Sequence, residues 1–97
     1  MAFSKWPDKD PEAIKDYAID WTALLVGAEV IDTSTWAITP VSTTSPLVDG
    51  TSSIVDGVTT VWLSGGEEGV TYSVVNHIVT DRGMEDDRTI QIKVKTQ

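Results

Sequence analysis

An all-β sandwich is the fold class that this 97-residue sequence predicts. Short apolar stretches with period-2 alternation follow one another along the chain, and turn signals separate them every ~8–12 residues. No segment shows the sustained 3.6-residue period of a long amphipathic helix. We therefore expect about six to seven short antiparallel strands in residues 16–97, preceded by an extended N-terminal arm in residues 1–15.

Prolines define the arm. Pro7 and Pro11 each bias the preceding residue toward extended or turn backbone, and charged residues fill the gaps between them. The first strand is expected at residues 16–21, where the larger apolar side chains fall on alternate positions. One helical turn within residues 11–18 is the competing interpretation, because Pro11 suits the first position of a helix.

The remaining strands are placed by β-branched and aromatic residues between turn signals. Asp56-Gly57 lies between β-formers and predicts a hairpin turn. Trp36 shares a face with Asp32, so we expect a bulge or bend near residues 32–34. Residues 40–50, 64–69 and 81–87 are expected to be loops or turns. Strands are therefore expected at residues 29–39, 52–55, 58–63, 70–80 and 89–95.

Tyr72 sharpens the fold prediction. It stands near the start of the penultimate strand, just after the turn at residues 64–69. Immunoglobulin-like sandwiches often place a tyrosine there, whose hydroxyl bonds back to the preceding corner. The alternative is an ordinary strand aromatic. The sequence therefore favours a small immunoglobulin-like β-sandwich.

Composition and charge argue against several classes of function. A net charge of −8, without clustered Lys or Arg, argues against nucleic-acid binding. The absence of cysteine argues against disulfides, thiolate metal sites and a cysteine nucleophile, and it fits synthesis in a cytoplasm. The N-terminal segment has no apolar core of a signal peptide, and no apolar run reaches the ~18 residues of a membrane span.

No residue pattern predicts catalysis. His77 is the single histidine, so a triad or a metal site lacks its usual partners, and a surface or interface position is expected for it. Neighbouring carboxylates at residues 67–68 and 86–87 fall in predicted turns, where they point apart and stay solvated. Asp8 begins a DxD spacing, but Ala13 and Ile19 stand where a calcium loop requires Gly and Glu. We expect no catalytic residue, no cofactor and no metal site.

The tryptophans divide into two groups. Trp21, Trp36 and Trp62 lie in or at the ends of predicted strands, and we expect them in the core or at its rim. Trp6 lies in the arm, where it either folds back to cap the sandwich or anchors a partner.

Four segments together resemble a known family: WPDKDPEAIKDYAIDWTALL, AEVIDTSTWAIT, VWLSGGEEGVTYSVVNHIVT and DDRTIQIKV. They are similar to small virion proteins of tailed bacteriophages, the fiber–tail adaptor or head–tail region structural proteins. The resemblance implies a non-enzymatic virion component, made in the host cytoplasm and present in several copies. Its partners would be other phage structural proteins of the tail, neck, fiber or capsid, with no nucleic acid and no membrane.

Within that resemblance we expect an adaptor whose arm lies along a neighbour, with Trp6, Pro7 and Pro11 as candidate partner-binding residues. Lys93 and Lys95 indicate that the edge of the last strand is protected while the protein is free. Capsid decoration is an alternative role. Carbohydrate or cell-surface binding is another, and it requires Trp36 and Trp62 to point outward together.

Overall fold

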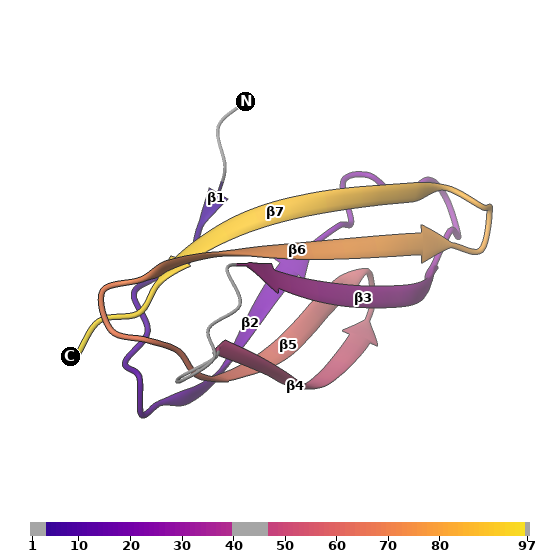
Figure 1. Cartoon of the computed structure of the whole chain (residues 1–97). Coiled ribbons are helices and arrows are strands. Elements are labelled where there is room, and N and C mark those ends of the chain that lie inside the picture. The colour runs from indigo at the N-terminus through magenta and orange to yellow at the C-terminus, as the bar shows by residue number, and fades with distance from the viewer. Residues whose placement is uncertain (1–3, 40–46, 97) are drawn as a thin grey trace.

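Two β-sheets packed face to face form the protein in the computed structural model, which describes residues 4–39 and 47–96 (Figure 1). One sheet has the strand order β1-β7-β6-β3 and the other the order β2-β5-β4. The named strands pair antiparallel, except that β1 runs parallel to β7, and the isolated bridge between Lys9 and Val94 is also parallel. The all-β sandwich predicted from the sequence is confirmed. The strands are β1 (Ser4–Lys5), β2 (Ile14–Asp20), β3 (Ile31–Thr39), β4 (Leu47–Val55), β5 (Val58–Gly65), β6 (Thr71–Thr80) and β7 (Glu85–Lys93).

Three strands begin earlier than the sequence-based expectation. β2 begins at Ile14, paired with Ser64, so strand replaces the alternative helical turn. β4 begins at Leu47, inside the expected loop of residues 40–50, of which residues 40–46 lie outside the described residues. β7 begins at Glu85, within the expected charged turn. Residues 85–87 are exposed, so ladder pairing with β6 extends the strand without burying their carboxylates.

Two predicted irregularities are confirmed. Asp56 and Gly57 have φ values of 50° and 79°, the positive pair that a tight hairpin turn requires. A Cβ at Gly57 would lie 3.0 Å from the side chains of Leu25 and Thr22, so glycine also permits close approach of a neighbouring loop. The β3–β6 ladder shifts register between Ile31 and Thr33, where the bulge was expected.

Side chains alternate between core and surface along the strands. On β6, Tyr72, Val74, Asn76 and Ile78 are fully buried, and the residues between them are half-buried. The Tyr72 hydroxyl accepts a hydrogen bond from the Glu67 backbone N–H at 2.8 Å, which confirms the tyrosine corner. The core also includes Tyr17, Ile19, Trp21, Ile31, Leu47, Val61, Leu63, Ile90, Ile92 and Val94.

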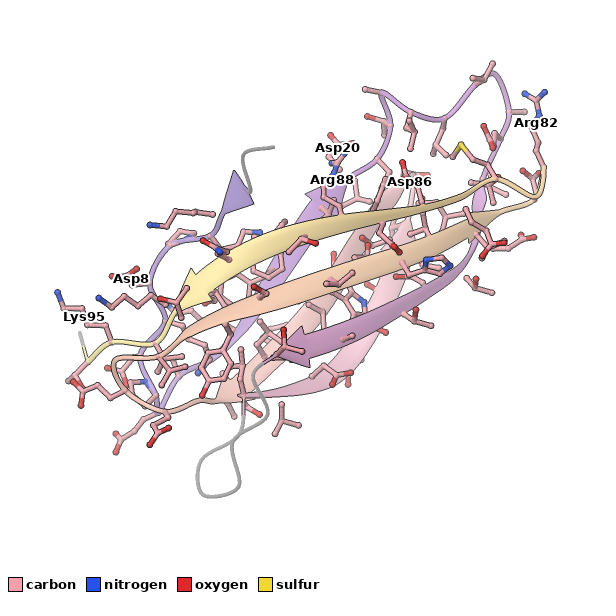
Figure 2. The ribbon with its side chains drawn as sticks, turned by 45° about the horizontal axis from the view of Figure 1, so that its top comes forward. Asp8, Asp20, Arg82, Asp86, Arg88 and Lys95 are labelled. Atoms are coloured by element: carbon pink, nitrogen blue, oxygen red, sulfur yellow. The ribbon has the colours of Figure 1, made fainter. Side chains whose placement is uncertain are left out.

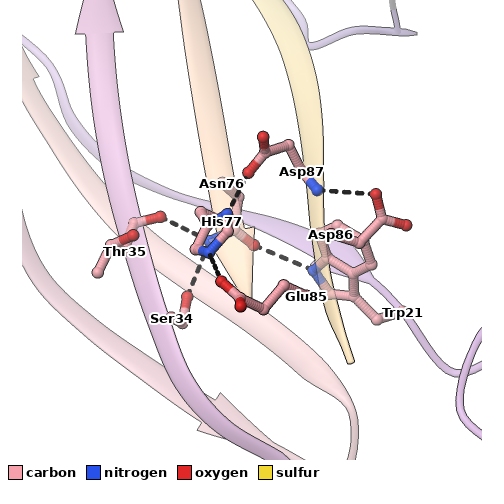
Figure 3. Close-up of polar contacts among 8 residues, drawn as sticks. All are labelled: Trp21, Ser34, Thr35, Asn76, His77, Glu85, Asp86 and Asp87. Atoms are coloured by element: carbon pink, nitrogen blue, oxygen red, sulfur yellow. Dashed lines mark hydrogen bonds and ion pairs between the residues drawn. The ribbon is translucent and has the colours of Figure 1, made fainter. Parts of the chain in front are cut away.

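A buried amide connects the two sheets. Asn76 is fully buried, and its Oδ1 accepts hydrogen bonds from Trp21 Nε1 at 3.0 Å and from Thr59 Oγ1 at 2.6 Å. Its Nδ2 donates to Ser34 Oγ at 2.8 Å and to the Thr35 carbonyl at 3.0 Å (Figure 3). Asn76 therefore joins β6 to β3 in its own sheet, and to β5 and the end of β2 in the facing sheet.

The network predicts unequal effects of two neighbouring substitutions on β5. Thr59→Val keeps the side-chain shape but removes the hydroxyl that bonds Trp21 and Asn76, so we expect a loss of about 1–3 kcal/mol of unfolding free energy. Thr60→Val, on the outward face, should change it by less than about 0.5 kcal/mol. Urea unfolding measures both values, and equal effects would contradict the role of the network.

Candidate protein-docking surfaces

Within residues 4–39 and 47–96, no group of three or more His, Asp or Glu side chains is placed to hold a metal ion. No helix in that part of the chain is long and apolar enough to cross a membrane.

His77 lies on the outer face of β6 and contacts two carboxylates of β7 (Figure 3). Its Nδ1 bonds Asp87, and its Nε2 lies 3.0 Å from Glu85 Oε1. The hydrogen bond to Asp87, and to a smaller extent the one to Glu85, raises the pKa of His77 above its ordinary value. The surface position expected for His77 is what the structure shows, and its neighbours are acidic groups of the next strand.

This cluster predicts a pH-dependent stability. Because the His77 pKa is raised on folding from 6.5, its stabilisation is fully present below about pH 6.5 and disappears as pH rises through the folded-state pKa. Asp87→Asn should therefore destabilise the protein more at pH 6 than at pH 9. Urea unfolding at both values measures this, with Asp16→Asn on the other sheet as the control. If Asp87→Asn lowered the unfolding free energy equally at both pH values, the predicted role of the His77 cluster would be contradicted.

Trp6 folds back onto its own chain. The core consists of two clusters of buried side chains, one that contains Tyr17 and one that contains Ile19, and the half-buried Trp6 indole packs against both. The centroid of the Trp6 ring lies 4.8 Å from that of Tyr17 and 6.4 Å from that of Trp36. The Trp6 backbone N–H donates to the Gln91 carbonyl at 3.0 Å. The sequence left two alternatives for Trp6, a cap on the sandwich or an anchor for a partner, and the structure shows it as a cap. Its role in partner binding stays a prediction.

The rest of the arm is also tied to the sandwich. Lys9 is fully buried, and its Nζ donates to the carbonyls of Gly65 at 2.7 Å and Asp10 at 2.9 Å. Burial lowers the pKa of Lys9. The Lys9 backbone bonds Lys93 and Lys95, both at 2.8 Å, so the arm itself covers this edge of the last strand. Pro7 is exposed and Pro11 is half-buried; no described contact tests their expected role.

The position of Trp6 predicts a contribution to stability. Trp6→Ala should lower the unfolding free energy by about 2–3 kcal/mol, below the cost for a fully buried tryptophan, because it leaves a void against Tyr17 and Trp36. Lys5→Ala, at an exposed arm position, is the control and should cost less than about 0.5 kcal/mol. Chemical denaturation measures both. Equal stability of the Trp6 variant and wild type would show that the arm does not cap the core.

Trp62 faces solvent on the outer side of the β2-β5-β4 sheet, so the expectation that it lies in the core or at its rim is wrong. Its neighbours Val61 and Leu63 take the inward positions of β5, which leaves Trp62 43% exposed. Trp36 stays half-buried against the core. The two indoles therefore do not form the shared outward platform that carbohydrate binding was expected to need.

Two exposed apolar side chains lie near Trp62 on the outer face of the sheet. In the next row of the outer face, Ile14 and Val48 are 68% and 46% exposed, and both pair with Ser64 of β5. A shallow groove of about 400 Å³ runs beside the indole, because Gly50 contributes no side chain there; it is lined by Ile14, Gly50, Thr51, Trp62 and Ser64. We call Ile14, Val48 and Trp62, with this groove, the Trp62 face.

The Trp62 face has an acidic border. Asp16 pairs with Trp62 across the β2–β5 ladder, and Asp20 lies further along the same outward row of β2. Both carboxylates are exposed. The face thus combines a rigid apolar centre with negative charge at its edge, a composition suited to contact with another protein.

The packed sheets define a small immunoglobulin-like β domain. The solution structure of the PKD domain from KIAA 1837 protein matches 95% of this chain and 83% of its own length, with a TM-score of 0.52 and 18% identity, and this similarity concerns the fold alone. No curated protein matches the sequence. The chain belongs to the family described as podophage GP4 fiber-tail adaptor protein gp77, whose model matches residues 9–93. The family resemblance found in the sequence is confirmed, and it identifies a phage structural adaptor.

Proposed function

We propose that this protein is a non-enzymatic adaptor in the tail or neck region of the virion, which joins a fiber or a neighbouring structural protein to the tail. Membership of the fiber-tail adaptor family supports this role. The Trp62 face is the observation that carries it, because a single exposed indole within an apolar groove is the kind of group that dominates the energy of protein interfaces.

The mechanism is passive binding by a preformed surface. Ile14, Trp62 and Val48 lie on three hydrogen-bonded strands, so their relative positions are fixed before a partner arrives. A preordered surface loses little conformational entropy on binding, which increases the affinity that a small contact can give. Several copies in a symmetric assembly would add avidity, so each contact can be weak.

A substitution at the centre of the Trp62 face tests the proposal. Trp62→Ala should reduce incorporation of the chain into particles at least about tenfold, since a central tryptophan contributes about 2 kcal/mol or more to an interface. Thr60→Ala, on the same outward row of β5, is the matched control and should assemble normally. In the experiment, purified chain is added to particles produced without it, the particles are sedimented, and the amount of chain bound to them is measured.

Location within the particle separates the alternatives. The wild-type chain should co-purify with tails after virions are split into heads and tails. Recovery with heads would instead support capsid decoration. Normal incorporation of the Trp62 variant would remove the Trp62 face from the mechanism, and binding of the free chain to bacterial surface polysaccharide, lost in that variant, would support the carbohydrate-binding alternative.

A further inference from the structure

One end of the sandwich gathers exposed apolar side chains away from the Trp62 face. There the segment of residues 21–30 meets the β4–β5 turn and the β6–β7 turn, at the right of Figure 1. Val26 and Val30 are 62% and 53% exposed, and Ile54 and Val55 are also exposed. We call these four residues and the elements that carry them the loop end.

Internal hydrogen bonds hold the loop end in place. The Glu29 carboxylate accepts bonds from the Val26 backbone N–H at 3.1 Å and from Thr80 Oγ1 at 2.5 Å. The hydrogen bond from Thr80, and to a smaller extent the one from Val26, lowers the pKa of Glu29. The Glu29 carboxyl is therefore ionised at neutral pH. The Val30 N–H donates to Asp81 Oδ1 at 3.1 Å. The segment that exposes Val26 and Val30 is therefore tied to the β6 end of the β6–β7 turn.

A notch lies beside these side chains. It has a volume of about 560 Å³, and its apolar lining includes Leu25, Val30, Ile31 and Ile54. Two carboxylates also line it, those of Glu29 and of Asp56 beside the hairpin glycine. Its size and apolar lining allow one or a few apolar side chains to enter from outside.

Charge at the loop end is strongly negative. Residues 21–32, 54–58 and 80–86 contain six acidic residues and one basic residue, Arg82. All five lysines of the chain lie elsewhere, in residues 5–15 and 93–95. Figure 2 shows Lys95 and Arg82 at opposite ends of the molecule. Two copies of this chain joined through their loop ends would bring like charges together, so the surface fits a partner of opposite charge.

We propose that the loop end is a second docking surface, which binds a segment of a neighbouring virion protein that carries an apolar side chain next to Lys or Arg. The apolar side chain enters the notch beside Val30 and Ile54, and the basic group faces Asp56 and Asp81. The inference rests on the proposed adaptor function, because an adaptor needs two separate surfaces to join two components. The Trp62 face supplies one, and the loop end supplies the other.

A photo-cross-linking experiment identifies what covers the loop end in the virion. Val26→benzoylphenylalanine in the full-length chain should form a cross-link to a different virion protein, within about three residues of a Lys or Arg, as mass spectrometry shows. Thr71→benzoylphenylalanine, at an exposed position at the opposite end of β6, is the control. A cross-link to another copy of this chain, to an acidic segment, or to nothing would overturn the proposal.

Substitutions separate the apolar and ionic parts of the contact. Val26→Ser with Val30→Ser should lower incorporation into particles at least about fivefold, and Asp56→Asn about threefold at 50 mM salt, with the Asp56 effect disappearing near 0.5 M because salt screens exposed charge. Asn tolerates the positive φ of Asp56, so the turn is kept. Asp49→Asn in β4 is the matched charge control, and unfolding curves establish that each variant is folded.

The two proposals fail in different ways. Failure of the wild-type chain to join particles made without it would contradict the adaptor function itself. Incorporation of the wild type together with equal incorporation of the Val26/Val30 double variant would contradict the loop-end surface alone.

Discussion

The buried amide of Asn76 is the constraint on which the rest of the structure depends. A polar group in an apolar core must find its hydrogen-bond partners inside the protein, and those of Asn76 come from β3, from β5 and from Trp21 after β2. All four bonds form together only when the two sheets face each other in one register. The network thereby fixes which side chains are left on the outer faces.

Fixed outer faces are what the proposed passive docking requires. Trp62 lies outward because Val61 and Leu63 occupy the core positions beside it in β5. Val26 and Val30 lie outward because the Glu29 and Asp81 carboxylates bond the backbone of their loop. In both places the chain exposes apolar side chains on backbone that is already ordered, so binding requires little further ordering.

The N-terminal arm packs onto the sandwich and covers part of its core. Trp6 lies against both core clusters, and the Lys9 ammonium takes the Gly65 carbonyl as a partner. These contacts bring the lysine-rich segments to the end opposite the acidic loop end. The molecule therefore has chemically different ends, which suits a protein that joins two unlike components in a defined direction.

The sequence by itself determined the features that depend on neighbouring residues. Alternation predicted the strands, Asp56-Gly57 predicted the hairpin, and Tyr72 predicted its corner, because backbone sterics and side-chain period act locally. Family-specific segments also indicated the adaptor family. The sequence carried no signal for the notch at the loop end, because it is lined by two separate segments, residues 22–31 and 54–57.

Only the tertiary structure decided the contacts that join distant segments. The sequence places Trp62 in a strand and Trp6 in the arm, yet Trp6 caps the core and Trp62 faces solvent, because sheet pairing and strand register determine which space each indole meets. The same holds for His77, whose two carboxylate neighbours depend on the β6–β7 register. Burial and long-range pairing are properties of the packed sheets, so no local pattern specifies them.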